Sequence, residues 1–62
     1  MINIKFTAAI NAITDHIDWC DKNILWHKEQ YYDAYHYRWL EDEKLQCIAA
    51  IKILKNNELI EE

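Results

Sequence analysis

The sequence has 62 residues, of which 52% are hydrophobic, and it contains neither glycine nor proline. A chain of this length makes one domain, residues 1–62, and buries only about 60% of the surface that its unfolded form exposes. Seven basic and eleven acidic residues give a formal net charge of −4, whereas a duplex-binding protein presents a basic surface. Length and charge therefore exclude a large enclosed active site and disfavour nucleic-acid binding.

The first half of the chain carries the pattern of an amphipathic helix. Its apolar residues recur at alternating steps of four and three, at Phe6, Ile10, Ile13, Ile17, Cys20 and Ile24. This spacing places them on one helical face. Asn3 or Thr7 can cap the start, because a short polar side chain accepts a hydrogen bond from an unpaired backbone N–H. We call this face the first seam.

A second helix is predicted in the C-terminal half. Its apolar face, the second seam, comprises Tyr37, Leu40, Cys47, Ile48, Ile51 and Leu54. Lys44 interrupts this seam, although its aliphatic stem can pack there while the ammonium group reaches water. Asn56 and Asn57 can end the helix, because asparagine tolerates the left-handed backbone conformation found at helix C-termini.

The two seams are out of phase, and this predicts a break between them. At about 100° per residue, Ile13 and Ile51 would lie roughly 160° apart on one continuous helix. The polar residues of segment 21–30 make it the preferred place for the break, with 41–43 as the alternative. Tight β-turns favour glycine or proline, and this chain contains neither. We therefore predict an all-α helical hairpin of two long helices, or three helices if the break lies elsewhere.

The segment 26–39 holds six of the eight aromatic residues of the chain. On a helix, Tyr32, Tyr35 and Trp39 would form a stripe at i, i+3 and i+7, about 100° or more from the second seam. Exposed tyrosine and tryptophan are typical of interaction sites. The predicted partner-binding residues are Trp26, Tyr31, Tyr32, Tyr35, Arg38 and Trp39.

A single helical hairpin buries little apolar surface to stabilise its folded state. Ordering each residue costs about 1.5 kcal/mol, and one seam per helix barely offsets that. Small helical hairpins commonly dimerise into four-helix bundles. We therefore expect a homodimer, and the alternative is a compact three-helix monomer whose core uses the aromatic rings.

The sequence offers weak signals for chemistry. His16 and Cys20 stand at i, i+4, a spacing that can present two ligands to one metal ion, and the further ligands would have to come from His27, His36 or Cys47. We favour the plainer interpretation, a buried cysteine with a histidine at its rim, and predict no metal and no cofactor. Asp33 and His36 have the i, i+3 carboxylate–imidazole spacing used in di-iron helical bundles, but we expect them to be an ordinary pair of surface residues. There is no serine, no glycine-rich phosphate loop and no recognisable nucleophile, so we predict that the chain is not an enzyme.

Location is predicted from apolar runs and cysteines. The longest apolar run, 47–51, is far shorter than the ~20 residues that span a bilayer. Segment 26–39 also has too few basic residues to favour binding to a membrane surface or to single-stranded nucleic acid. Without a secretory signal or metal-type cysteine spacing, we expect two free thiols in a cytoplasmic protein.

The leading hypothesis for function is a small non-catalytic protein-binding module that acts as a steric inhibitor of a larger protein. Its aromatic face would dock, while Arg38 and the acids 41–43 form a polar rim. The composition, rich in isoleucine, asparagine and lysine, suggests an AT-rich genome such as that of a phage or mobile element, where such proteins antagonise host defence. The alternatives are a structural homodimer with an acidic surface and a metal-binding helical bundle.

Overall fold

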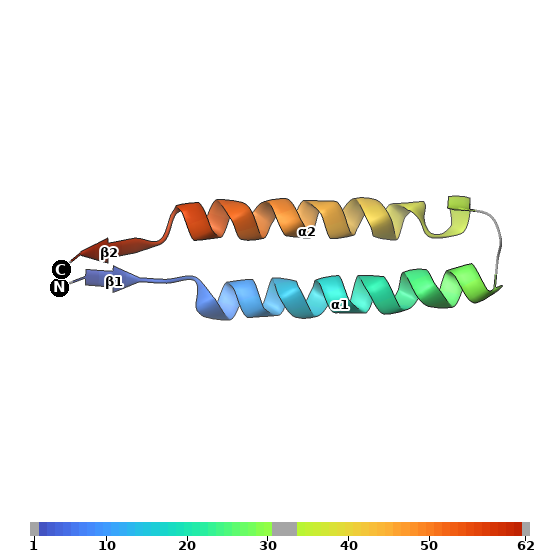
Figure 1. Ribbon diagram of the computed structural model, residues 1–62, viewed down its shortest axis with the longest axis horizontal. Helices are drawn as coiled ribbons and strands as arrows, with labels where there is room; N and C mark the ends of the chain where they lie inside the picture. The colour runs from blue at the N-terminus through green and yellow to red at the C-terminus, as the bar shows by residue number, and fades with distance from the viewer. Residues whose placement is uncertain (1, 31–33, 62) are drawn as a thin grey trace.

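The protein is a long helical hairpin closed by a short β-ladder. The computed structural model describes residues 2–30 and 34–61. In chain order its elements are β1 (Ile2–Ile4), α1 (Thr7–Gln30), the 3-10 helix η1 (Ala34–His36), α2 (Arg38–Asn56) and β2 (Leu59–Glu61). The two long helices run antiparallel, and the ladder lies at the end of the molecule opposite the connection between them (Figure 1). The prediction of an all-α hairpin of two long helices is confirmed, with the two strands as an addition.

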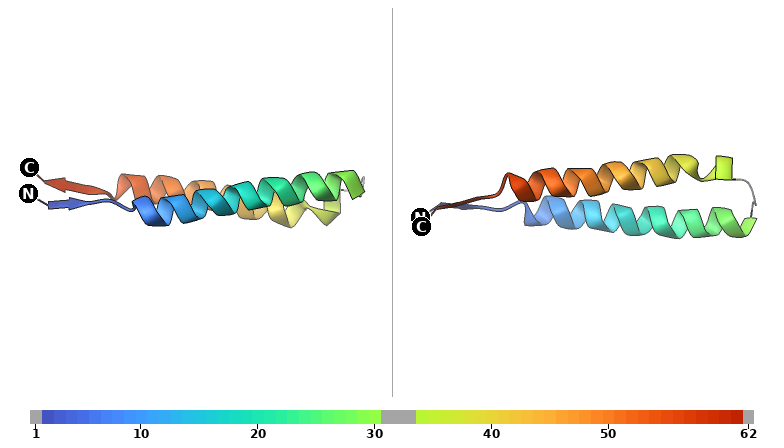
Figure 2. Two further views of the ribbon diagram at one scale, coloured as in Figure 1. Left: turned by 90° about the horizontal axis from the view of Figure 1, so that it is seen from below. Right: turned by 45° about the horizontal axis from the view of Figure 1, so that its top comes forward.

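The hairpin is elongated rather than globular. Its principal extents are 53 × 14 × 9 Å and its radius of gyration is 15.5 Å, against about 11 Å for a compact domain of this length. In the described residues the two helices form a single layer, as the other views show (Figure 2). Each helix therefore packs along one face only and presents the rest of its surface outwards.

The two predicted seams form the interface between the helices. Every residue of both seams is buried or half-buried. Among the described residues only Cys20 and Leu40 are fully buried, so the core is thin. Lys44 sits in the second seam as expected, half-buried, with its Nζ 2.7 Å from Asp21 Oδ1 on α1.

The break between the helices is not in segment 21–30, because α1 continues to Gln30. The polar residues there support the helix instead of ending it. Lys22 Nζ lies 2.9 Å from the Asp18 carboxylate one turn earlier, a favourable i, i+4 pair. The Asn23 amide donates to the Trp19 carbonyl at 2.8 Å instead of capping a new helix.

The alternative break at 41–43 is also wrong, because these residues lie within α2. Acidic side chains near a helix N-terminus interact favourably with the positive end of the helix dipole. Glu41 occupies the first turn of α2, so the acidic run marks a helix start. The described connection between the helices consists of η1 and Tyr37, whose carbonyl accepts from the backbone N–H groups of Leu40 and Glu41.

The C-terminus of α2 falls where Asn56 and Asn57 predicted it, but by another mechanism. Asn57 has φ −104°, and no described residue has a positive φ, so the expected left-handed end is absent from this part of the chain. The Asn57 side-chain amide instead donates to the Ile53 carbonyl at 2.7 Å. This bond satisfies one of the carbonyls that a helix end leaves unpaired.

The strands β1 and β2 were not predicted from the sequence. They pair antiparallel in the register Ile2↔Glu61, Asn3↔Ile60 and Ile4↔Leu59. Lack of glycine and proline disfavours tight turns, but this ladder needs none, because the helical hairpin itself brings the two ends together (Figure 1). Isoleucine on both strands suits extended backbone.

Neither described helix has the length and apolar character needed to cross a membrane.

Truncation at the core should be far more costly than truncation of an exposed leucine. Leu40 is 0% exposed and Leu45, on the same helix, is 64% exposed. We expect Leu40→Ala to lower the free energy of unfolding by about 2–5 kcal/mol and Leu45→Ala by about 0.5 kcal/mol or less, both measured by urea denaturation. Equal losses would contradict the described core.

Candidate functional site

An exposed aromatic surface lies where the helices are connected. Tyr35 of η1 and Trp39 of α2 line a cavity of about 390 Å³ together with Arg38 and Asp42. Tyr35 is 80% exposed and Trp39 is 54% exposed. We call these four residues the tip surface. Two aromatic rings beside a cavity, flanked by one positive and one negative side chain, have the composition that is enriched at protein–protein interfaces.

The structure brings together three of the six predicted partner-binding residues, Tyr35, Arg38 and Trp39. Trp26 is 51% exposed, but it lies on α1, packs edge-on against His27 and does not line the tip cavity. Tyr31 and Tyr32 lie outside the described residues. The expected single helical stripe is wrong for its two described members, because Tyr35 belongs to η1 and Trp39 to α2.

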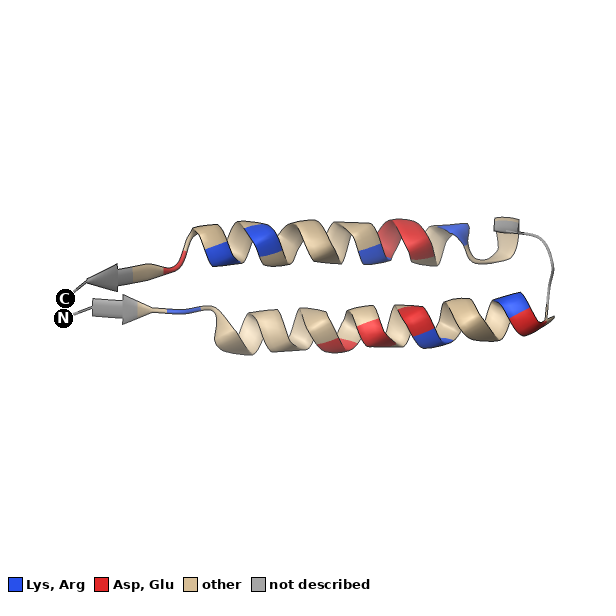
Figure 3. Ribbon diagram, viewed as in Figure 1, with Lys and Arg blue, Asp and Glu red and all other residues tan. Residues whose placement is uncertain are grey.

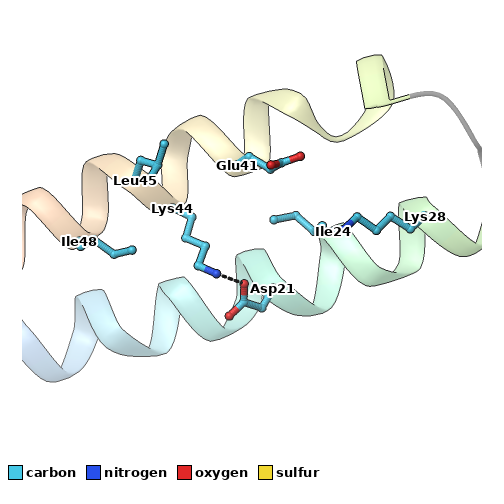
Figure 4. Close-up of a pocket in the computed structure, with 7 residues that line it drawn as sticks. All are labelled: Asp21, Ile24, Lys28, Glu41, Lys44, Leu45 and Ile48. Carbon is cyan, nitrogen blue, oxygen red and sulfur yellow. Dashed lines mark ion pairs between the residues drawn. The ribbon is translucent and has the colours of Figure 1, made fainter.

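A groove on the hairpin is lined by residues of both helices, and both of its lysines make contacts within the protein. Its cavity of about 380 Å³ is lined by Asp21, Ile24, Lys28, Glu41, Lys44, Leu45 and Ile48 (Figure 4). Lys44 points across it to Asp21 (Figure 4), and Lys28 Nζ lies 5.3 Å from the centre of the Tyr37 ring. The first contact joins the two helices and the second joins α1 to the residue that precedes α2, so the groove contributes to the packing of the hairpin.

The charged residues of the two helices do not form a surface of one sign. Basic and acidic residues are interspersed along both helices over the described segments (Figure 3). A basic stripe that could follow a nucleic-acid backbone is not formed by these residues.

A second cluster joins the helices near the middle of α1. His16 and Cys20 approach Glu43 of α2, and one ligand atom of each lies within 4.8 Å of the others. The Glu43 carboxylate is the hub, because its Oε2 lies 3.4 Å from His16 Nε2 and accepts a weak hydrogen bond from Cys20 Sγ at 3.8 Å. Cys20 is fully buried, while the His16 and Glu43 side chains are 43% and 41% exposed.

This environment raises the pKa of the Cys20 thiol above its ordinary value of 9.0. Burial is the main cause, and the negative charge of Glu43 adds to it, since both disfavour the thiolate. Cys20 is therefore a protonated thiol at neutral pH. The prediction of a buried cysteine with a histidine at its rim is confirmed.

Glu43 is the member of this cluster that sequence reasoning missed. The expected completing residues were His27, His36 or Cys47, and Glu43 was assigned to a polar rim. A signal was present, however, because an antiparallel hairpin folded about its midpoint pairs residues equally far from the two ends. Cys20 and Glu43 stand in that relation, as do the paired residues of the β-ladder.

Comparisons with protein-family models, with curated proteins and with solved structures find no match.

The raised pKa of Cys20 can be measured by its reactivity. In a Cys47→Ser variant, the rate of alkylation follows the thiolate fraction, so its pH midpoint reports the pKa of Cys20. We expect this midpoint to lie above 9.0 in the folded protein and to return to the ordinary value in concentrated urea. Because the folded state keeps the proton longer, this group should also make unfolding easier as pH rises above 9.0. A folded-state midpoint at or below the value in urea would contradict the described burial.

Proposed function

We propose that this protein is a non-catalytic protein-binding module that docks through its tip surface onto a larger protein. Its action is steric, because the docked hairpin covers a surface that the partner needs. The proposal includes a cytoplasmic setting. Neither cysteine forms a disulfide, as expected in a reducing compartment.

The observation that carries the proposal is an excess of exposed surface. The accessible surface is 5089 Å², whereas a compact monomer of 7.6 kDa exposes about 4300 Å². The excess, about 800 Å², equals one partner's share of a standard protein–protein interface. Much of the surface is apolar, since large hydrophobic side chains on both helices are more than 40% exposed.

The tip surface is the part of this area best suited to a partner. Tryptophan, tyrosine and arginine dominate the energetics of interfaces, and Tyr35, Arg38 and Trp39 surround one cavity. The two rings would enter an apolar depression on the partner, and Arg38 would pair with a carboxylate at its rim. Asp42 lies one turn after Arg38. Its negative charge would repel a partner that places an acidic side chain opposite it.

The nature of the target extends the proposal further. The isoleucine-, asparagine- and lysine-rich composition supports an origin in an AT-rich phage or mobile element. A host defence protein is the class of partner that this origin favours. Composition alone supports this part of the proposal.

A homodimer is the second candidate, and a separate observation favours it. Leu45 and Ile53 of α2 are both more than 60% exposed, and only two side chains among the described residues are fully buried. The monomer thus leaves large apolar side chains in contact with water. A second hairpin packed against this face would bury them in a four-helix bundle.

The docking proposal can be tested with two matched tryptophan variants. Trp39 and Trp26 are almost equally exposed, but only Trp39 belongs to the tip surface. A protein captured from host lysate by the wild type should be retained by Trp26→Ala and lost by Trp39→Ala. Titration of the purified partner should then show Trp39→Ala weakening binding by about 30-fold, the size of an interface hot spot.

Circular dichroism and sedimentation equilibrium complete the test. Trp39→Ala should keep the helical content and the mass of the wild type. If the wild type is a dimer and Trp39→Ala a monomer, the tip surface serves self-association and the docking proposal fails. Equal capture by both variants would also contradict it.

A further inference from the structure

The cluster of His16, Cys20 and Glu43 has the dimensions of a metal site. With metal–N and metal–O distances of about 2.0 Å and a metal–S distance of about 2.3 Å, a tetrahedral zinc site has N···O and S···O edges of about 3.3 and 3.5 Å. The observed separations are 3.4 Å for His16 Nε2 to Glu43 Oε2 and 3.8 Å for Cys20 Sγ to the same oxygen. Two edges of a coordination tetrahedron are thus close to the expected lengths. The third pair, His16 Nε2 and Cys20 Sγ, lies within 4.8 Å and would close to about 3.5 Å on metal binding.

We propose that the protein binds one Zn²⁺ ion per chain at this cluster. The ligands are His16 Nε2, Cys20 Sγ and a carboxylate oxygen of Glu43, with water in the fourth position. The cluster shares no residue with the tip surface, and this proposal does not depend on the docking proposal.

The donor set selects zinc over the hard cations. A thiolate is a soft ligand, and Mg²⁺ and Ca²⁺ prefer sites made entirely of oxygen. Imidazole, thiolate and carboxylate are all established zinc ligands, and three protein ligands leave one position for an exchangeable water. The His16 and Glu43 side chains are 43% and 41% exposed, so solvent can reach the cluster and supply that water.

The charges balance on binding. A neutral imidazole, one thiolate and one carboxylate together cancel the two positive charges of the ion, which matters beside a buried sulfur. The Cys20 thiol loses its proton to solvent, and the electron pair left on sulfur forms the bond to the metal. No atom is oxidised or reduced. In the metal-free protein the Cys20 thiol donates its proton in a hydrogen bond to Glu43 Oε2. The metal ion would take the place of that proton between the two side chains.

A neighbouring ring orients the histidine ligand. The imidazole of His16 stacks on the indole of Trp19, with ring centroids 5.2 Å apart and an angle of 12° between the planes. A metal bound to Nε2 lies in the imidazole plane, so the indole covers a ring face without blocking the nitrogen. This stacking restricts the ring before the metal arrives, which lowers the ordering cost of binding.

Cobalt substitution tests the ligand set directly. Full-length protein freed of metal by chelation is titrated with Co²⁺ under reducing conditions and followed by absorption spectroscopy. We expect saturation at one Co²⁺ per chain, sulfur-to-cobalt charge transfer, and d–d bands of the intensity typical of four-coordinate cobalt. Zn²⁺ should then displace Co²⁺ stoichiometrically.

Matched variants separate the cluster from its surroundings. Cys20→Ser should abolish charge transfer, while Cys47→Ser should keep it. Glu43→Gln and His16→Gln change half-exposed side chains and should keep the helical content while weakening Zn²⁺ binding by at least about 100-fold. Asp15→Asn removes the exposed acid that precedes His16 on α1 and should leave Zn²⁺ affinity within about threefold of the wild type.

Three results would overturn the proposal. The first is titration without a sulfur-to-cobalt band. The second is saturation at one metal ion per two chains, which would mean a site shared between copies. The third is a Glu43→Gln variant that folds normally and binds Zn²⁺ as tightly as Asp15→Asn does.

Discussion

The register of α1 against α2 is the constraint on which the rest of this structure depends. Two contacts define it at mid-helix, the pair of Lys44 with Asp21 and the approach of Glu43 to Cys20. The β-ladder continues the same register at the chain ends, where Ile2 lies opposite Glu61. A shift by one helical turn would move Glu43 about 5.4 Å along the axis. Such a shift would separate it from both His16 and Cys20 and would misalign the strands.

The interface between α1 and α2 buries few side chains completely, so most of the surface of each helix stays accessible. Cys20 and Leu40 are the only described residues with no exposed surface, and the helices form one layer. In a protein of this size, binding of a partner or a metal adds directly to stability, because only the folded state presents the site. The tip surface and the cluster of His16, Cys20 and Glu43 are neighbours on α2, where Glu43 directly follows Asp42, but they share no residue.

The sequence predicted the periodic features well. All residues of both seams are at least half-buried, and Lys44 packs its stem among them, because burial on one helical face imposes a repeat that can be read from residue types. It also predicted the helix end near Asn57. Helix boundaries in the middle of the chain were less predictable. Polar residues such as Asn23 can end a helix or make bonds within it, and only tertiary packing decides between these.

Contacts between distant residues were the least predictable. The i, i+4 spacing of His16 and Cys20 identified a pair on one helix, but the sequence does not state which residue of the other helix faces them. Glu43 became visible only with the interhelical register. Likewise the β-ladder depends on ends that a folded hairpin brings together. Tyr35 and Trp39 were expected on one helix, and the turn at Tyr37 places them in separate elements that still share a cavity.

The most direct test of this account is the interhelical register in solution. Nuclear Overhauser effects measured on isotopically labelled protein should connect the β-protons of Cys20 with the γ-protons of Glu43. They should also connect backbone protons of β1 and β2 in the register of Asn3 with Ile60. Contacts from Cys20 to residues one turn away on α2, in place of Glu43, would contradict the structure and the metal site built on it.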